Sequence, residues 1–168
     1  NNKKVDSSLN QGERLSSSLQ SMGTTFIKLG QFLATRPDII GDELSKELEN
    51  LQDRLPPFSQ DKAREIIKKD LGEQSFNSII NLSEPVAAAS IAQVHKAQIN
   101  DGGTIKDVAI KILRPDIKKI FNEEIDALML FAFFVESFVK KTKRLKLVEV
   151  VFLLKEITNL EMDLRFEA

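Results

Sequence analysis

The sequence has no cysteine, tryptophan or tyrosine, and its only histidine is His95. Without cysteine the chain forms no disulfide, zinc–thiolate site or cysteine nucleophile, and this composition fits a reducing compartment. A lone histidine also excludes a metal site built from several histidines. The net charge of −1 and the missing Tyr and Trp rings argue against nucleic acid as a partner, because that binding relies on basic surfaces and stacking aromatics.

Long apolar runs are also missing. The longest uninterrupted one, residues 127–135, falls well below the roughly 20 residues of a membrane-crossing helix. With 42% hydrophobic and 29% charged residues, the 168-residue chain has the balance of a globular domain with its own core. The first residues show no signal-peptide pattern, and the last ones continue a helical pattern without a stop signal, so we expect a piece of a longer protein.

Residues 1–58 are predicted to form a helical N-terminal extension. Leucines at helical spacing occupy residues 9–22, a second helix runs from about Thr24 to Arg36, and Asp42 caps a third. Pro56–Pro57 then form a rigid break. We therefore expect one domain over residues 1–58 and a second over residues 59–168.

The second domain is predicted to combine helices with a small antiparallel sheet. Ser59 caps a helix that ends at Gly72. Strands over residues 92–99 and 106–113 flank an Asn-Asp-Gly-Gly turn. Asp116 caps a long helix that reaches about residue 141, and a last helix runs from about residue 145 to the end. This order of helices, sheet and helices predicts an α+β fold.

The sequence Val108-Ala109-Ile110-Lys111 places a charge within the second predicted strand. Alternation along a strand puts Ala109 and Lys111 on one face and the two branched residues on the other. A lysine on an inner sheet face is costly unless an anion pairs with it, as phosphate oxygens do in protein kinases. Taken alone, the tetrapeptide fits an edge-strand lysine that points to water better.

Small residues precede this lysine at positions 86–90, Val-Ala-Ala-Ala-Ser, where a kinase carries its glycine-rich phosphate loop. Small side chains let backbone N–H groups approach phosphates. Alanine does not share the positive φ angles of glycine, so this loop should be stiffer. The alternative is a buried turn whose small residues only save space.

Two further motifs make these features resemble the UbiB/ADCK family of atypical protein-kinase-like proteins. That family has an alanine-rich loop and a Lys-x-Gly-Gln motif in an N-terminal helix, matched here by Lys28-Leu29-Gly30-Gln31. It also has a Glu-x-Asp motif, matched by Glu161-Met162-Asp163, and then a glutamate that pairs with the strand lysine, matched by Glu167. The four features follow the family's order over residues 24–168.

The resemblance implies a helical extension packed on a partial kinase-like N-lobe, ending before the C-lobe with its catalytic-loop and magnesium-binding residues. It assigns phosphate contact to Lys111 and orientation of that lysine to Glu167. By this resemblance, the phosphates are covered by the backbone of Ala87, Ala88, Ala89 and Ser90. The resemblance assigns a regulatory lid to Lys28, Gly30, Gln31, Glu161 and Asp163. The implied cofactors are ATP or ADP with Mg²⁺, whose ligands would lie mostly beyond this chain, and no metal ligand is expected in it.

The acids of the last predicted helix raise a geometric question. Asp163 and Glu167 are four residues apart and would share a face, whereas Glu161 would lie about 200° from Asp163. Either the two motif carboxylates face different ways or the helix is irregular there. A solvated helix face is the alternative for all three.

The function implied by the resemblance is ATP binding by an atypical kinase or ATPase that supports ubiquinone biosynthesis, incomplete and inactive as this piece. The implied partners are prenylated quinone precursors and other ubiquinone-biosynthesis proteins. The implied location is the bacterial cytoplasm or inner-membrane surface, or the mitochondrial matrix side. The alternative is a non-catalytic scaffold or lipid-binding module with a vestigial sheet. Phe131, Phe133 and Phe134 fit either packing between helices or an exposed patch for a membrane surface.

Overall fold

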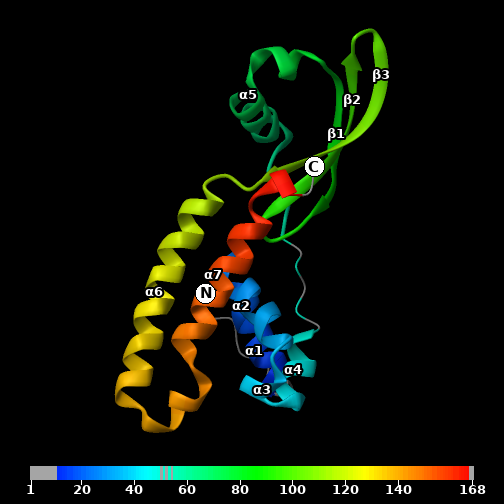
Figure 1. Cartoon of the computed structure of the whole chain (residues 1–168). Coiled ribbons are helices and arrows are strands. Elements are labelled where there is room, and N and C mark those ends of the chain that lie inside the picture. The colour runs from blue at the N-terminus through cyan, green and yellow to red at the C-terminus, as the bar shows by residue number, and fades with distance from the viewer. Residues whose placement is uncertain (1–10, 50, 52, 54, 167–168) are drawn as a thin grey trace, which may run out of the picture. The chain divides into compact units, whose positions relative to one another are not determined.

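The computed structural model describes residues 11–49, 51, 53 and 55–166 (Figure 1). The chain divides into two compact units. One unit comprises residues 1–52 and 121–160, and the other comprises residues 53–120 and 161–168. The domain boundary expected near residue 58 stays a prediction.

The first unit opens with four helices that the sequence largely predicts. They are α1 (Gln11–Met22), α2 (Thr24–Ala34), α3 (Pro37–Ile40) and α4 (Asp42–Glu49). Gly23 (φ 109°) and Gly41 (φ 86°) lie between them in a backbone conformation that favours glycine. The second helix ends two residues earlier than expected, and Pro37 begins the short α3, because proline suits a first helical position. The side chains of Leu19, Ile27, Leu48 and Leu51 are buried.

The same unit contains a helical hairpin of α6 (Ile117–Phe138) and α7 (Leu147–Glu161), which run side by side in opposite directions (Figure 1). A short 3₁₀ segment, η1 (Lys140–Leu145), forms the tip. Glu136 accepts a hydrogen bond from the backbone N–H of Val148 at 3.1 Å, which joins the end of α6 to the start of α7. Ile125 on α6 and Leu154 on α7 are both buried.

The second unit is a three-stranded antiparallel sheet with one helix, α5 (Gln60–Asn77), against it. The strands are β1 (Ile79–Ala88), β2 (Ala92–Asp101) and β3 (Thr104–Leu113), in the order β1-β2-β3. The hairpin turn lies where the sequence predicts it, with positive φ at Gly102 and Gly103. The α+β fold class is thus confirmed, and β1 is a strand that the sequence did not reveal.

The helix α5 begins and bends at the residues that the sequence indicates. The Ser59 hydroxyl accepts a hydrogen bond from the Lys62 N–H at 3.3 Å, as an N-cap does. Gly72 interrupts the helix with φ 79°, but the chain then resumes a helical course to Asn77 instead of ending there. The core between α5 and the sheet is formed by Ala63, Ile67, Leu82, Ala97 and Ile112.

The end of the chain departs from the sequence prediction. The last helix was expected to continue to residue 168, but α7 ends at Glu161 and a 3₁₀ turn, η2, follows over Leu164–Phe166. Asp163 therefore lies outside the helix, and the shared helical face predicted for Asp163 and Glu167 is wrong. The irregular course near Glu-x-Asp, which was the other expectation, is the one observed. Glu167 itself lies outside the described residues.

Candidate functional site

Lys111 lies on the face of the sheet that points away from α5. Its neighbours along β3, Ile110 and Ile112, belong to the side that packs on α5, which confirms the predicted alternation. In the register, Lys111 pairs with Val94, and Val94 pairs on its other side with Ala87. Ala87, Val94 and Lys111 thus form one row across all three strands, with a cation at one end and a methyl group at the other.

The row continues into a polar surface along the same face. The next pair is Lys96 with Ala109, and after it Gln98 pairs with Asp107, whose carboxylate accepts a 3.0 Å hydrogen bond from the Gln98 amide. A hollow of about 550 Å³ is lined in part by Lys96, Asp107 and Ala109. Two lysines beside small side chains give this face room and positive charge for an anionic ligand.

The alanine-rich segment is mostly strand and only partly loop. Ala87 and Ala88 belong to β1 and pair with Val94 and Gln93, so the connection to β2 is the short turn of Ala89, Ser90 and Ile91. Ser90 is fully buried. Its backbone N–H donates to Asp53 at 2.8 Å, and the Ala89 N–H donates to the Ala92 carbonyl at 2.8 Å. In this conformation two amides of the predicted phosphate loop already have protein acceptors.

His95 belongs to a buried network rather than to an open site. Its Nδ1 lies 2.8 Å from the Ser83 carbonyl and its Nε2 lies 2.8 Å from the Gln93 amide nitrogen. Because the carbonyl can only accept and the amide N–H₂ can only donate, the proton belongs on Nδ1. Gln93 also holds both backbone groups of Phe58, accepting from the N–H at 2.9 Å and donating to the carbonyl at 3.2 Å. These contacts give the lone histidine a structural role.

The Lys-x-Gly-Gln motif lies in the middle of α2, as predicted. Gly30 is buried, and a Cβ atom there would lie 2.5 Å from Leu51 Cδ2 and 2.9 Å from Leu19 Cδ1. Both distances are too short for real contacts, so the glycine lets the side chains from α1 and from the segment after α4 close over α2. Lys28 and Gln31, which flank it, are partly exposed.

The Glu-x-Asp motif lies at the end of α7. Glu161 is the last helical residue and Asp163 follows the helix. The Arg165 guanidinium donates to both Asp163 oxygens, at 2.7 and 2.5 Å, and this pairing lowers the pKa of Asp163 to about 2. Asp163 is therefore a carboxylate at any physiological pH. The structure tests neither its lid role nor that of Glu161.

Comparisons with known proteins identify the family of this chain. A family model described as ABC1 atypical kinase-like domain matches residues 50–168, which contain the sheet, the lysine row and the Glu-x-Asp motif. The chain belongs to this family. The relative from Marinobacter nauticus named "Probable protein kinase UbiB" is 39% identical over 161 residues, covering 95% of this chain and 29% of the relative.

Relatives with the same printed name come from other bacteria. Those from Cellvibrio japonicus and Azotobacter vinelandii are each 38% identical and cover 95% and 92% of this chain. The chain thus spans just under a third of the length of these relatives. It is a partial ABC1 domain, and the resemblance drawn from the sequence motifs is confirmed.

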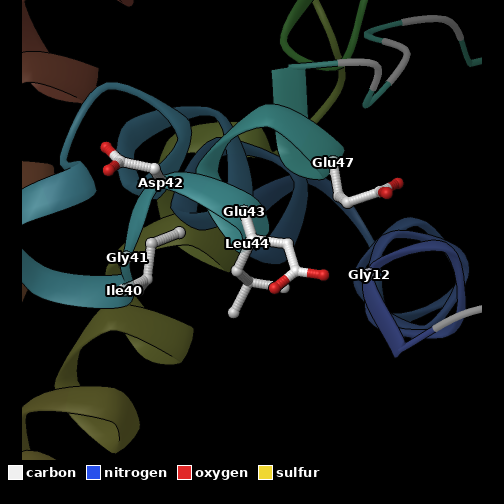
Figure 2. A pocket seen from close by; sticks show the side chains of 7 residues that line it. All are labelled: Gly12, Ile40, Gly41, Asp42, Glu43, Leu44 and Glu47. Atoms are coloured by element: carbon white, nitrogen blue, oxygen red, sulfur yellow. The ribbon is translucent and has the colours of Figure 1, made fainter.

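A second hollow, which lies outside the residues matched by the ABC1 model, is unsuited to nucleotide. It has a volume of about 530 Å³ and lies beside α4 in the helical unit, with Gly12 and Gly41 in its lining. Figure 2 shows the carboxylates of Asp42, Glu43 and Glu47 projecting from α4 around it. Three acidic groups would repel phosphates. The hollow on the sheet has one lysine, Lys96, and one carboxylate, Asp107, in its lining.

The described residues give magnesium no ready ligand set. Within them, no group of three or more acidic or histidine side chains is arranged to hold a metal ion. Lys111 suits phosphate oxygens and not a cation. The described residues therefore do not fit Mg²⁺. Across the same residues, no helix combines the length and apolar character that crossing a bilayer requires.

Sequence reasoning missed the two side chains that hold the turn of this ABC1 domain, Asp53 and Arg114. Arg114 donates from Nε and Nη2 to the Ala89 carbonyl, at 2.9 and 2.8 Å. A weak signal was available, because an arginine directly before Pro115, at the end of a strand, is well placed to bind carbonyls near the strand end. No local signal marks Asp53, which lies 37 residues from Ser90, whose backbone N–H donates to it.

Proposed function

We propose that this chain is the nucleotide-binding part of a UbiB-like atypical kinase or ATPase, in which Lys111 holds the nucleotide phosphates. The observation that supports this most is the row of Ala87, Val94 and Lys111 on the face of the sheet that points away from α5. A kinase-type strand lysine performs this task, and membership of the ABC1 family makes nucleotide the expected ligand class. The methyl group of Ala87 leaves space for an approaching phosphate or ring.

The remaining assignments extend this proposal. Glu167 would orient Lys111, and Lys28, Gln31, Glu161 and Asp163 would form a lid over the nucleotide. The alanine-rich segment would form the wall beside the phosphates. In the full-length protein the activity would support ubiquinone biosynthesis. The family membership and the motif order support these roles, and the catalytic-loop residues would come from other parts of the protein.

The test uses the full-length protein that contains this chain. Calorimetry with ADP and ATP, each with and without Mg²⁺, compares the wild type with Lys111→Ala. A hydrogen bond to a charged group contributes about 1.5–3 kcal/mol, so we expect affinity to fall by roughly tenfold or more. Lys106→Ala is the matched control, since Lys106 lies on the same strand in an exposed ion pair with Asp101. Equal binding by wild type and Lys111→Ala would refute the assignment, and a wild type that binds no nucleotide would favour the non-catalytic scaffold.

An aromatic surface on the α6–α7 hairpin supports a second function, docking on an anionic lipid surface. It consists of Leu130, Phe131, Phe133, Phe134, Phe138 and Val139, all exposed. Packing between helices is thus excluded as the role of the three clustered phenylalanines in this structure, since 51–65% of each is exposed. The basic tip that follows, with Lys140, Lys143 and Arg144, matches anionic headgroups.

Vesicle sedimentation of the full-length protein tests this docking. We expect binding to vesicles with phosphatidylglycerol to exceed binding to pure phosphatidylcholine, and Phe134→Ser/Phe138→Ser to reduce it severalfold. Ile105→Ser, which removes an exposed apolar side chain from the sheet hairpin, is the control. Unchanged sedimentation of the double variant would refute lipid docking through this surface. Docking would place the chain where prenylated quinone precursors reside.

A further inference from the structure

The turn between β1 and β2 is held by side chains from outside the sheet's hydrogen-bond ladder. Its backbone groups find partners as follows: the Ala89 N–H binds the Ala92 carbonyl, the Ser90 N–H binds Asp53, and the Ile91 carbonyl accepts from the Arg114 N–H at 2.9 Å. Of these three bonds, only the one from Ala89 to Ala92 lies within the turn itself. The conformation of the turn is therefore determined by groups that approach it from elsewhere in the chain.

Arg114 is the main one of these groups. It lies directly after β3 and binds three carbonyls with one guanidinium. Nε and Nη2 donate to Ala89 at 2.9 and 2.8 Å, Nη1 donates to Pro56 at 3.0 Å, and Nη2 also lies 3.3 Å from the Leu55 carbonyl. Partial burial lowers the pKa of Arg114, and the nearby charge of Asp53 opposes that effect. A planar fork of this kind fixes geometry in a way that a lysine does not.

Asp53 approaches the turn from the segment that precedes α5. Its Oδ1 accepts from the Ser90 N–H at 2.8 Å. The same segment is held by Arg114 at Leu55 and Pro56, and by the Gln93 amide at Phe58. Contacts at Asp53, at Leu55 and Pro56, and at Phe58 thus tie this part of the chain to the end of the sheet. We call Asp53 and Arg114 together the turn latch.

The position of the turn latch relates it to the proposed nucleotide site. Ala87 stands in the row with Lys111, and Ala89 is two residues further along the chain. Arg114 binds the Ala89 carbonyl and therefore also holds the end of β1 at a fixed distance from Lys111. Because alanine and serine lack the conformational range of glycine, an unlatched turn has few other shapes in which to keep this distance.

We propose that Asp53 and Arg114 are positioning residues that hold the alanine-rich turn in the shape required for binding the phosphates of a nucleoside di- or triphosphate. This inference rests on the proposed nucleotide-binding function. The two side chains do not touch the ligand; they act through the Ala89 carbonyl and the Ser90 amide. A second consequence is that nucleotide binding and the contacts of Asp53 and of residues 55–58 stabilise each other, because both depend on the same turn.

The experiment measures ADP affinity of the full-length protein by calorimetry, together with its melting temperature. We expect Arg114→Gln and Asp53→Ala each to weaken ADP binding by roughly tenfold, which is the effect of a small misplacement at a binding site. Asp53→Asn should keep near wild-type affinity, because an amide oxygen still accepts from the Ser90 N–H. Arg114→Lys should fall between wild type and Arg114→Gln, since it keeps the charge but not the fork.

A core variant separates positioning from general destabilisation. Ile67→Ala removes buried volume between α5 and the sheet without a contact to the turn. If positioning is the role, Ile67→Ala lowers the melting temperature at least as much as Arg114→Gln does but leaves the ADP affinity unchanged. Equal losses of affinity in both variants would overturn the proposal, as would full affinity in both Arg114→Gln and Asp53→Ala.

The outcomes also separate this proposal from the one it rests on. A wild type that binds no nucleotide, or a Lys111→Ala variant that binds as well as wild type, would refute the proposed function. Wild-type binding that is lost in Lys111→Ala but kept in both latch variants would refute only the latch. Hydrogen exchange gives an independent readout: ADP should slow exchange of the Phe58 amide in the wild type and not in Arg114→Gln. Equal slowing in both would contradict the coupling.

Discussion

Replacement of Gln93 by methionine tests the buried network that joins the sheet to the segment before α5. The Gln93 amide is fully buried and makes three hydrogen bonds, two to the backbone of Phe58 and one to His95 Nε2. Methionine has a similar volume and flexibility, so it fills the space without replacing any of these bonds. The substitution therefore removes hydrogen bonding with little change in packing.

The expected loss of stability follows from the groups left without partners. His95 Nε2 remains in the interior, where an unsatisfied polar atom costs about 1–3 kcal/mol. The N–H and carbonyl of Phe58 are only partly buried, so water can reach them and they add about 0.5–1 kcal/mol each. The sum is roughly 3 kcal/mol, and for a chain of 168 residues this corresponds to a drop in melting temperature of about 6–12 °C.

Thermal unfolding followed by circular dichroism measures this difference, and urea unfolding checks the free energy. Gln98→Met is the matched control, because Gln98 lies on the same strand, is exposed and bonds only at the surface, to Asp107. Its cost should stay within about 0.5 kcal/mol. If Gln93→Met costs no more than Gln98→Met, the network contributes nothing to stability and the reasoning is wrong.

The remaining predictions concern pH and the Asp163–Arg165 pair. In an NMR titration the Asp163 carboxyl should titrate at about pH 2, and in Arg165→Gln its pKa should return toward the ordinary 3.8, since the lowering comes mainly from that hydrogen bond. Because the folded pKa is lowered, any stability from the pair is present above pH 4 and lost as the pH falls toward 2. Wild type and Arg165→Gln should therefore converge in melting temperature over that interval. A difference in melting temperature that stays constant down to pH 2 would contradict the link between the Asp163–Arg165 pair and stability.

The sequence predicted most of the fold where the pattern is local. The hairpin of β2 and β3 was found because both strands alternate and an Asn-Asp-Gly-Gly turn joins them. β1 was missed because register shifts lie between Ile79 and Ala87, and these bulges hide the alternation around Pro85.

The end of α7 could not be read from apolar spacing. The spacing continues through Leu164, but Asp163 accepts from the Arg165 backbone N–H at 3.3 Å as well as from its guanidinium. A short aspartate that binds the backbone two residues on competes with helix formation. The helix therefore ends at Glu161, although propensity alone would extend it.

The candidate site, like the fold, was predicted from the sequence only where the pattern is local. Lys111 was placed on the correct face from alternation alone, and the Lys-x-Gly-Gln motif was placed in its helix. Asp53 and Arg114 were not found, because they bind backbone groups 37 and 25 residues away, and such pairings leave no periodic trace in a sequence. Side chains that bind distant backbone groups are visible only once the strands are in register.

The exchange of glycine for alanine in the turn has a physical consequence for phosphate recognition. In a glycine-rich loop, backbone N–H groups are available to turn toward phosphates. Here the Ala89 and Ser90 amides already donate to protein acceptors, and the turn latch holds them there. On the proposed function, recognition of the phosphates then depends more on the Lys111 side chain and less on the turn's amides. A single cation acts as a point charge and leaves the orientation of the phosphates to the shape of the surrounding wall. The position of the turn, set by Asp53 and Arg114, becomes the feature that determines which phosphate lies against Lys111.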